Sequence, residues 1–284
     1  MATFTNQATL SYNNTTTSSN VVTGQLLEVL SAAKTAVTDT YAEGDVITYI
    51  LSIVNSGAVS FTNLTVTDDL GGYTFAGETL YPLDYIPGSL RLYINGVQQA
   101  APSASAEAPL EITGLAIPAN SNAILVYEAR VNGYASLTEG STIVNTAVID
   151  GGGLSTAVEA SATVTAQSGP RLTISKSICP ATVTENGQLT YTFVIQNSGS
   201  QSATAEASII VRDLFDPILE GLTVTLDGDP LAVGVGYTYD QATGEFATIA
   251  GQITVPAADY VQDPATGLWV IQPGVAVLTV TGTV

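Results

Sequence analysis

The sequence predicts an all-β fold. Thr, Val, Ala, Ser and Gly dominate the 284 residues, and only 11% of the residues are charged. The alternation of apolar and polar side chains, as in VITYILSIVN at residues 46–55, is typical of half-buried strands. No segment combines a sustained helical period with good caps, so we expect very little helix.

An internal repeat indicates two copies of one domain. KTAVTDTYAEGDVITYILSIVNSG at residues 34–57 matches KSICPATVTENGQLTYTFVIQNSG at residues 176–199, at one constant offset and without a gap. The chain is long enough for two domains that each bury a core. We therefore expect a first domain at residues 30–167 and a second at residues 168–284.

Turn signals divide each copy into short strands. Asn-Ser-Gly ends the first long strand of each copy, and DQATG at 240–244 and DPATG at 263–267 predict two hairpins in the second. Many short strands at this spacing, with no helices between them, are typical of an immunoglobulin-like β-sandwich. We predict two tandem sandwiches of this type.

The two copies differ at their ends. The first copy closes with two strands, at residues 142–150 and 155–166, and nothing comparable follows residues 275–284 of the second. ATFTNQATLSY at residues 2–12 matches the first of these closing strands, with Asn6 on Asn145. We expect residues 1–29 to form a β-hairpin that corresponds to the missing end of the second domain.

This hairpin is predicted to complete the second domain of a neighbouring subunit. We expect residues 13–19 to be its turn and residues 20–30 its closing strand. A link of about five residues spans at most roughly 17 Å, whereas the incomplete domain should lie on the order of 40 Å away by strand lengths. The donor residues are predicted to be Phe4, Asn6, Ala8, Leu10, Val21 and Leu26. The alternative is a disordered N-terminal arm and a truncated last domain.

Three polar residues recur at equivalent places. They are Lys34, Asp68 and Asn145 in the first domain, and Lys176, Asp213 and the hairpin residue Asn6 in the second. A lysine, an asparagine and a carboxylic acid in an apolar core are the ingredients of a spontaneous Lys-Asn isopeptide bond, since burial favours the neutral amine and the protonated acid. The alternative is an exposed lysine, a turn-forming aspartate and an asparagine bonded to the backbone, and the sequence leaves both open.

The pattern of Lys, Gly-Asp or Gly-Gln, Thr-Tyr, Asn-Ser-Gly and Val-Asn-Thr-Ala resembles the bacterial surface-protein tandem repeat known as the eleventh domain of unknown function. The whole chain also resembles structural proteins of the ribbon-like appendages on clostridial endospores. These resemblances imply an extracellular or spore-surface location, with other appendage or surface proteins as further partners. Residues 1–7 do not look like a signal peptide, which suits assembly in the mother cell or a trimmed precursor.

Composition argues against several other functions. The net charge of −19 disfavours binding to nucleic acid or anionic lipid, and no apolar run is long enough for membrane insertion. Without His, and with Cys179 as the one cysteine, neither a Ser-His-Asp nor a Cys-His site can form, and no disulfide framework exists. No enzyme acting on external substrate, cofactor or metal is predicted. The acidic pairs at 68–69 and 227–229 are expected to form turns.

The sequence thus predicts a structural subunit of a filament that polymerises head to tail by donor-strand complementation, with isopeptide bonds as a possible lock. The alternative function is a surface adhesin that binds a glycan or protein through its loops. The insertion at residues 77–111 could form such a face, through Tyr81, Tyr85, Tyr93 and the stretch APSASAEAP.

Overall fold

Strands account for almost all regular structure in the computed structural model, which describes residues 2–284. One 3-10 turn, η1 (Ala205–Ala207), is the single helical segment in that range. The predicted all-β fold is therefore confirmed. The chain divides into two compact units, one containing residues up to 39, 44–132 and 143–164, and the other residues 40–43, 133–142 and 165–284.

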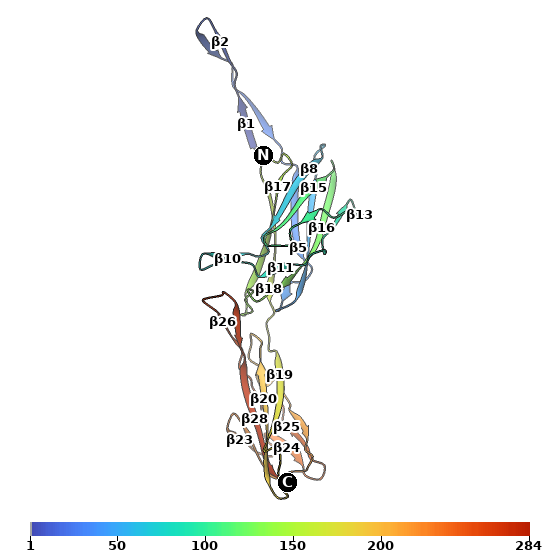
Figure 1. Cartoon of the computed structure of the whole chain (residues 1–284), viewed down its shortest axis with the longest axis vertical. Helices are drawn as coiled ribbons and strands as arrows, with labels where there is room; N and C mark the ends of the chain where they lie inside the picture. The colour runs from blue at the N-terminus through green and yellow to red at the C-terminus, as the bar shows by residue number, and fades with distance from the viewer. Residues whose placement is uncertain (1) are drawn as a thin grey trace. The chain divides into compact units, whose positions relative to one another are not determined.

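Two six-stranded sheets form the first sandwich. One has the order β13-β12-β16-β7-β5 with β11 also paired to β16, and the other has the order β14-β15-β8-β17-β18-β6 (Figure 1). The strands of the first sheet are β5 (Leu30–Ala36), β7 (Val46–Asn55), β11 (Leu83–Tyr85), β12 (Arg91–Ile94), β13 (Val97–Gln99) and β16 (Ser121–Val131). Those of the second are β6 (Thr40–Tyr41), β8 (Phe61–Asp68), β14 (Ser103–Ala104), β15 (Leu110–Ile117), β17 (Thr142–Gly151) and β18 (Val158–Ala166). A separate short hairpin joins β9 (Tyr73–Phe75) to β10 (Glu78–Leu80).

The core of the first sandwich follows from the alternation in β7. Ile47, Tyr49, Leu51 and Ile53 are all at most 1% exposed, whereas the side chains between them point away from the core. Successive strand residues face opposite sides of a sheet, so a period of two places one row of apolar side chains inside. The predicted alternation of the β7 side chains between two faces of the sheet is confirmed.

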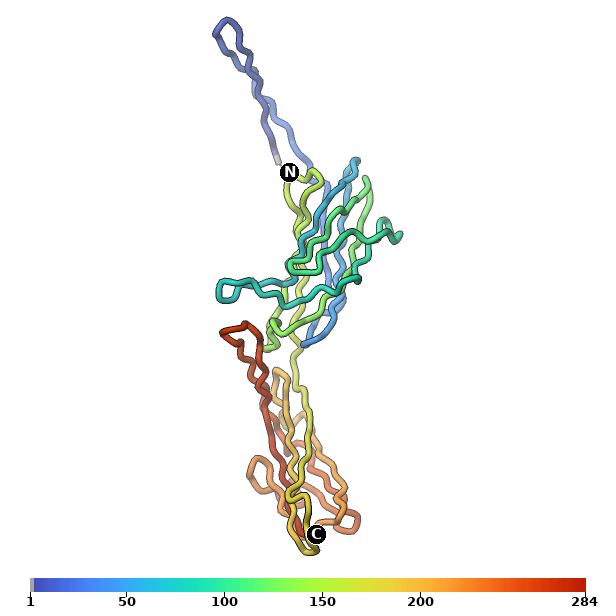
Figure 2. Tube along the Cα trace, viewed as in Figure 1, coloured from blue at the N-terminus to red at the C-terminus, as the bar shows by residue number. Residues whose placement is uncertain are grey.

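Three sheets make up the second sandwich. Their orders are β19-β20-β28-β22-β23, β21-β25-β24 and β26-β27. The strands are β19 (Leu172–Cys179), β20 (Gln188–Asn197), β21 (Arg212–Leu214), β22 (Glu220–Leu226), β23 (Asp229–Leu231), β24 (Tyr237–Asp240), β25 (Glu245–Thr248), β26 (Asp259–Gln262), β27 (Trp269–Gln272) and β28 (Gly274–Thr283). The trace in Figure 2 shows β28 running beside β20. The hairpins predicted at 240–244 and 263–267 are confirmed as β24-β25 and β26-β27.

The N-terminal segment is a long hairpin, and within residues 2–284 its strands pair only with one another. β1 (Ala2–Asn6) pairs with β4 (Val22–Leu26), and β2 (Thr9–Tyr12) pairs with β3 (Thr15–Ser18). The turn consists of Asn13 and Asn14, both with positive φ, so the prediction of a turn over the whole of residues 13–19 is wrong. Asparagine tolerates this backbone conformation, whereas the β-branched threonines that follow favour a strand.

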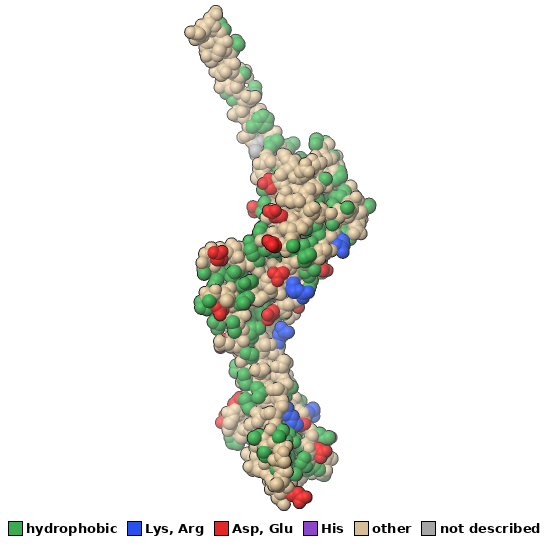
Figure 3. All heavy atoms as spheres, in the orientation of Figure 1, with side chains coloured by type: hydrophobic (Ala, Val, Ile, Leu, Met, Phe, Trp, Pro, Cys, Tyr) green, Lys and Arg blue, Asp and Glu red, His purple; other side chains and the backbone are tan. Residues whose placement is uncertain are grey.

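The surface carries the acidic excess of the sequence. Acidic side chains are scattered over the face shown in Figure 3, with few basic ones among them. No helix within the described residues has the length and the apolar character needed to span a membrane.

Candidate functional site

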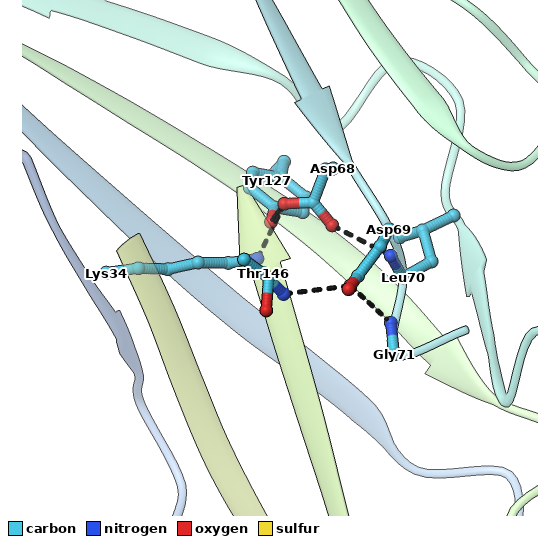
Figure 4. Close-up of polar contacts among 7 residues, drawn as sticks. All are labelled: Lys34, Asp68, Asp69, Leu70, Gly71, Tyr127 and Thr146. Atoms are coloured by element: carbon cyan, nitrogen blue, oxygen red, sulfur yellow. Dashed lines mark hydrogen bonds and ion pairs between the residues drawn. The ribbon is translucent and has the colours of Figure 1, made fainter. Parts of the chain in front are cut away.

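Lys34 and Asp68 form an ion pair inside the first sandwich. Lys34 lies on β5 and Asp68 ends β8, and Nζ of the lysine donates to Oδ2 of the aspartate at 2.6 Å (Figure 4). The two side chains are 0% and 1% exposed. Burial lowers the pKa of Lys34, against the opposing effect of Asp68 and, more weakly, Asp69. The pairing predicted for these two residues is thus present, and the alternative of an exposed lysine does not hold here.

Two further groups hold the carboxyl group of Asp68. Its Oδ1 accepts the backbone N–H of Leu70 at 3.1 Å, and its Oδ2 also accepts the hydroxyl of Tyr127. Tyr127 lies on β16, far from β8 in the sequence. Burial, together with the charge and hydrogen bond of Asp68, raises the pKa of Tyr127 well above its ordinary value. Because these partners fix both oxygens, the orientation of the acid is well defined.

The neighbouring residue Asp69 ties the end of β8 to β17. Its Oδ1 accepts the backbone N–H groups of Gly71 at 2.9 Å and of Thr146 at 2.8 Å. Its own N–H donates to the carbonyl of Thr146 at 2.9 Å. Asp69 therefore has the turn role that the sequence predicted for this acidic pair, whereas Asp68 belongs to the core.

Asn145 completes the group in the first sandwich. β17 pairs with β8 so that Ala147 lies opposite Asp68, and Asn145 lies two residues earlier on the same buried face. Its side chain is in contact with the Tyr127 hydroxyl, where it partly offsets the rise in the pKa of Tyr127. Asn145 is 0% exposed, yet neither its amide nitrogen nor its amide oxygen has a well-formed hydrogen bond. A fully buried amide without such bonds is destabilising and calls for a chemical explanation.

The equivalent pair in the second sandwich is open to solvent. Nζ of Lys176, on β19, donates to Oδ2 of Asp213, on β21, and Oδ1 of the aspartate accepts the N–H of Leu214 at 3.0 Å. The Lys176 and Asp213 side chains are 39% and 18% exposed. The same two residue types therefore meet in both sandwiches, but only the first pair is shielded from water.

A free strand edge accounts for this exposure. In the first sandwich β8 lies between β15 and β17, whereas its counterpart β21 pairs with β25 alone within the described chain. Every residue of β19 is exposed, including Leu172, Ile174 and Ile178, whereas β5 buries Leu30 and Lys34. Residues 2–284 thus supply the second sandwich with no strands of its own in the places of β17 and β18.

The apolar residues of the hairpin are exposed. Phe4 and Asn6 on β1 lie opposite Gly24 and Val22 on β4, and the Phe4 ring lies over Gly24, where a Cβ atom would be 2.3 Å away. Phe4 is 58% exposed. The strand register thus places Phe4, Asn6 and Val22 on one face of the hairpin.

The other predicted donor residues lie along the same hairpin. Leu26 ends β4 and Leu10 lies on β2, and both are exposed. Ala8 lies between β1 and β2, where its N–H donates to the Ser19 hydroxyl at 3.0 Å. Val21 precedes β4 and is also exposed. Val22, which is not among the predicted donor residues, lies opposite Asn6.

The tyrosines of the predicted adhesive insertion have different environments. Tyr85 lies on β11 and is only 8% exposed, with its ring 6.4 Å from that of Tyr127. Tyr81 and Tyr93 are half-buried. Tyr85 therefore contributes to the core instead of to a binding face.

The acidic pair at residues 227–229 lies in a turn. Asp227 has a positive φ, and its Oδ1 accepts the N–H of Val277 at 2.7 Å. No cluster of three or more potential metal-ligating side chains occurs within the described residues. Cys179, at the end of β19, is an exposed free thiol.

Comparisons with known proteins identify only distant structural similarity. No family model matches the chain, and no curated protein sequence matches it. Similar solved structures include the pilus backbone RrgB of Streptococcus pneumoniae, at 13% identity over 86% of this chain and 55% of that chain, with a TM-score of 0.35. Another is BcpA, the major pilin subunit of Bacillus cereus, at 13% identity over 95% of this chain and 73% of that chain, with a TM-score of 0.36.

A third similar structure is the collagen-binding domain of a Staphylococcus aureus adhesin, at 10% identity over 49% of this chain and 99% of that domain, with a TM-score of 0.31. The chain spans about half the length of the S. pneumoniae structure. At these identities and TM-scores, the similarity carries no functional assignment.

Proposed function

We propose that this protein is the structural subunit of a bacterial cell-surface or spore-surface filament, in which the hairpin of one subunit completes the second sandwich of the next. The observation that carries the proposal is the free edge of β21, which has the same place in its sandwich as the fully paired β8. An unpaired strand edge is a ready acceptor for a strand from another chain.

The first sandwich supplies the expected register of the added strand. There Ala147 lies opposite Asp68 and Ile149 opposite Val66. The repeat places Ala8 at the position of Ala147, so Ala8 would lie opposite Asp213 and Leu10 would enter the core. In the same register Asn6 has the place of Asn145, beside Lys176.

Burial of apolar surface would drive the assembly. The exposed Leu172, Ile174 and Ile178 of the acceptor, and Phe4 and Leu10 of the donor, would all pass into one core. Each such side chain contributes about 1.5–3 kcal/mol when fully buried. The donor and acceptor are different surfaces of the same protein, so the contact does not close on itself and a filament results.

In the first sandwich we propose a covalent bond between Lys34 and Asn145. The ammonium of Lys34 passes a proton to Asp68, and the neutral amine attacks Cγ of Asn145 while the protonated acid donates to the amide oxygen. The Nζ–Cγ bond forms and the Cγ–Nδ2 bond breaks. Two protons from the original ammonium leave with Nδ2 as an ammonium ion, and Asp68 returns to a carboxylate.

The matching bond in the second sandwich would join subunits. Lys176 of one subunit would react with Asn6 of the next, with Asp213 as the acid, by the same exchange of an amide nitrogen for the lysine nitrogen. Hairpin docking would shield Lys176 and Asp213 from water, as β17 and β18 shield Lys34 and Asp68. The filament would then be a covalent polymer.

Two full-length variants test the proposal with one reactive end each. Lys176→Ala keeps the donor Asn6, and Asn6→Ala keeps the acceptor Lys176, so a mixture can form covalent dimers and nothing larger. We expect an SDS-resistant dimer in the mixture and in neither variant alone, while the unsubstituted protein forms a ladder. Only monomers in every sample would refute the intersubunit bond.

Negative-stain imaging tests the filament separately from the bond. The unsubstituted protein and Lys176→Ala should both form filaments, whereas deletion of residues 2–27 should abolish them. Filaments that persist after the deletion would refute donor-strand assembly. A protein that stays monomeric yet binds a surface would favour the adhesin alternative.

A further inference from the structure

Each of the two lysines lies beside a stacked pair of aromatic rings. In the first sandwich, Nζ of Lys34 is 5.1 Å from the centroid of the Tyr49 ring and 5.9 Å from that of Tyr127. In the second, Nζ of Lys176 is 4.2 Å from the centroid of Tyr191 and 5.6 Å from that of Phe215, and a third ring, that of Phe193, is 5.5 Å away. Tyr49 and Tyr191 are equivalent in the repeat. The second ring, however, is a tyrosine in one sandwich and a phenylalanine in the other.

These second rings come from different parts of the fold, since Phe215 follows the end of β21. Tyr127 lies on β16 opposite Tyr49, but the residue opposite Tyr191 on β28 is Val280. Phe215 instead follows Asp213 by two residues, which is the position of Leu70 after Asp68. Both rings stack on the equivalent tyrosine, at 5.7 Å for Tyr127 and 5.0 Å for Phe215. In the first sandwich the large side chain is Tyr127 on β16 and the small one is Leu70 after β8. In the second sandwich the large side chain is Phe215 after β21 and the small one is Val280 on β28.

The exchange keeps the ring but removes a hydroxyl group. Tyr127 donates a hydrogen bond to Oδ2 of Asp68, the oxygen that also accepts from Lys34. Phe215 cannot donate to Asp213. A hydrogen bond to a carboxylate stabilises its charged form, whereas the isopeptide reaction requires a protonated acid and a neutral amine.

We propose that Tyr127 is a positioning residue: its hydroxyl binds Oδ2 of Asp68, the oxygen that must take the proton of Lys34, and so slows the bond in the first sandwich, whereas the second sandwich, without this hydroxyl, reacts faster once the hairpin has docked. This inference rests on the proposed function. It gives the intersubunit reaction the faster chemistry, which suits a bond that must form while two subunits are held together only by noncovalent contacts. The bond in the first sandwich has no such limit, because its groups belong to one folded unit.

The test transfers the arrangement of the first sandwich to the second. The test acceptor carries Asn6→Ala, Phe215→Leu and Val280→Tyr. The matched control carries Asn6→Ala, Phe215→Leu and Val280→Phe, so the two proteins differ by one hydroxyl group. Each is mixed with increasing concentrations of the Lys176→Ala donor, and the covalent dimer is followed with time by denaturing electrophoresis. The plateau rate reports the chemistry, and the half-saturating donor concentration reports docking.

We expect the Val280→Tyr acceptor to have a plateau rate about tenfold below that of the Val280→Phe control, as one hydrogen bond to a charged group would produce. The half-saturating concentration should be the same for both. Equal plateau rates, or a faster Val280→Tyr acceptor, would overturn the inference while leaving the proposed function intact. Absence of dimers even from the acceptor with the natural core would overturn the intersubunit bond, and the inference with it.

A second measurement guards against acceptors that do not fold. Tyr127→Phe in the full chain should accelerate the loss of ammonia from the first sandwich, followed by intact mass during cell-free synthesis. Tyr49→Phe is the control, since it removes a hydroxyl from the other ring beside Lys34. An unchanged or slower reaction in Tyr127→Phe would contradict the inference.

Discussion

Lys34 and Lys176 have the same position in their strand pairs, opposite Leu51 and Phe193, yet the first side chain is fully buried and the second is 39% exposed. The difference follows from the strands beside β8 and β21, because β17 pairs with β8 and no described strand has the matching place beside β21. The two lysines therefore have equivalent places in the two sandwiches but different exposure to solvent.

Removal of each lysine should affect stability very differently. Lys34→Met leaves Asp68 as a buried charge without its partner, which typically destabilises by about 3–5 kcal/mol. Lys176→Met in the unassembled subunit should change the free energy of unfolding by less than about 1 kcal/mol, because the pair is partly exposed. Chemical denaturation measures both. Both substitutions belong in an Asn145→Ala background, so that loss of the covalent bond does not contribute to the comparison.

The stability of the first sandwich should depend on pH when the bond cannot form. In Asn145→Ala, burial keeps the pKa of Lys34 below the value of 10.5 that it has in the unfolded chain. The unfolded state then binds more protons, so the free energy of unfolding should rise with pH from the lowered pKa toward about pH 10. Above that, the raised pKa of Tyr127 reverses the trend, because the unfolded tyrosine loses its proton first.

Denaturation of Asn145→Ala across this range of pH provides the measurement. The matched control is Asn145→Ala combined with Lys34→Met, in which the rise should be absent. An equal rise in the control would assign the effect to other groups.

Docking should depend on one face of the hairpin. Phe4→Ala removes a side chain expected in the acceptor core, and such a truncation typically loses about 3–5 kcal/mol. Thr5→Ala, on the opposite face of β1, should change docking by less than about 0.5 kcal/mol. The critical concentration for filament formation in a Lys176→Ala background measures both without interference from the covalent bond. Similar effects of the two substitutions would argue against the proposed facing.

Asp213 should be required for the bond but not for docking. Asp213→Ala in the Asn6→Ala acceptor should still bind the Lys176→Ala donor, but it should form no SDS-resistant dimer, because the acid that exchanges protons with Lys176 is missing. Asp216→Ala is the control, since this exposed aspartate belongs to the same segment. Sedimentation reports binding, and denaturing electrophoresis reports the bond. Undiminished dimer formation in Asp213→Ala would exclude its role as the acid.

Sequence alone predicted the long strands of both copies, a hairpin at residues 1–29 and the recurrence of lysine, aspartate and asparagine. These features depend on local alternation, turn residues and the offset of the repeat, all of which can be read along the chain. It did not predict Tyr127 as a partner of Asp68, or Phe215 as the ring that replaces it. A tyrosine in an alternating strand looks like any core residue.

Only the tertiary structure decided which of the two lysines is buried and which groups surround it. Burial and hydrogen bonding depend on strand neighbours that are far apart in the sequence, as Tyr127 is from Asp68. Tyr127 with Leu70 in the first sandwich corresponds to Val280 with Phe215 in the second. This correspondence became visible only through strand pairing, because one volume can be filled either from a strand or from the segment that follows another strand. Composition and spacing thus determined the class of fold and the residue types of the site, and packing determined their chemical environment.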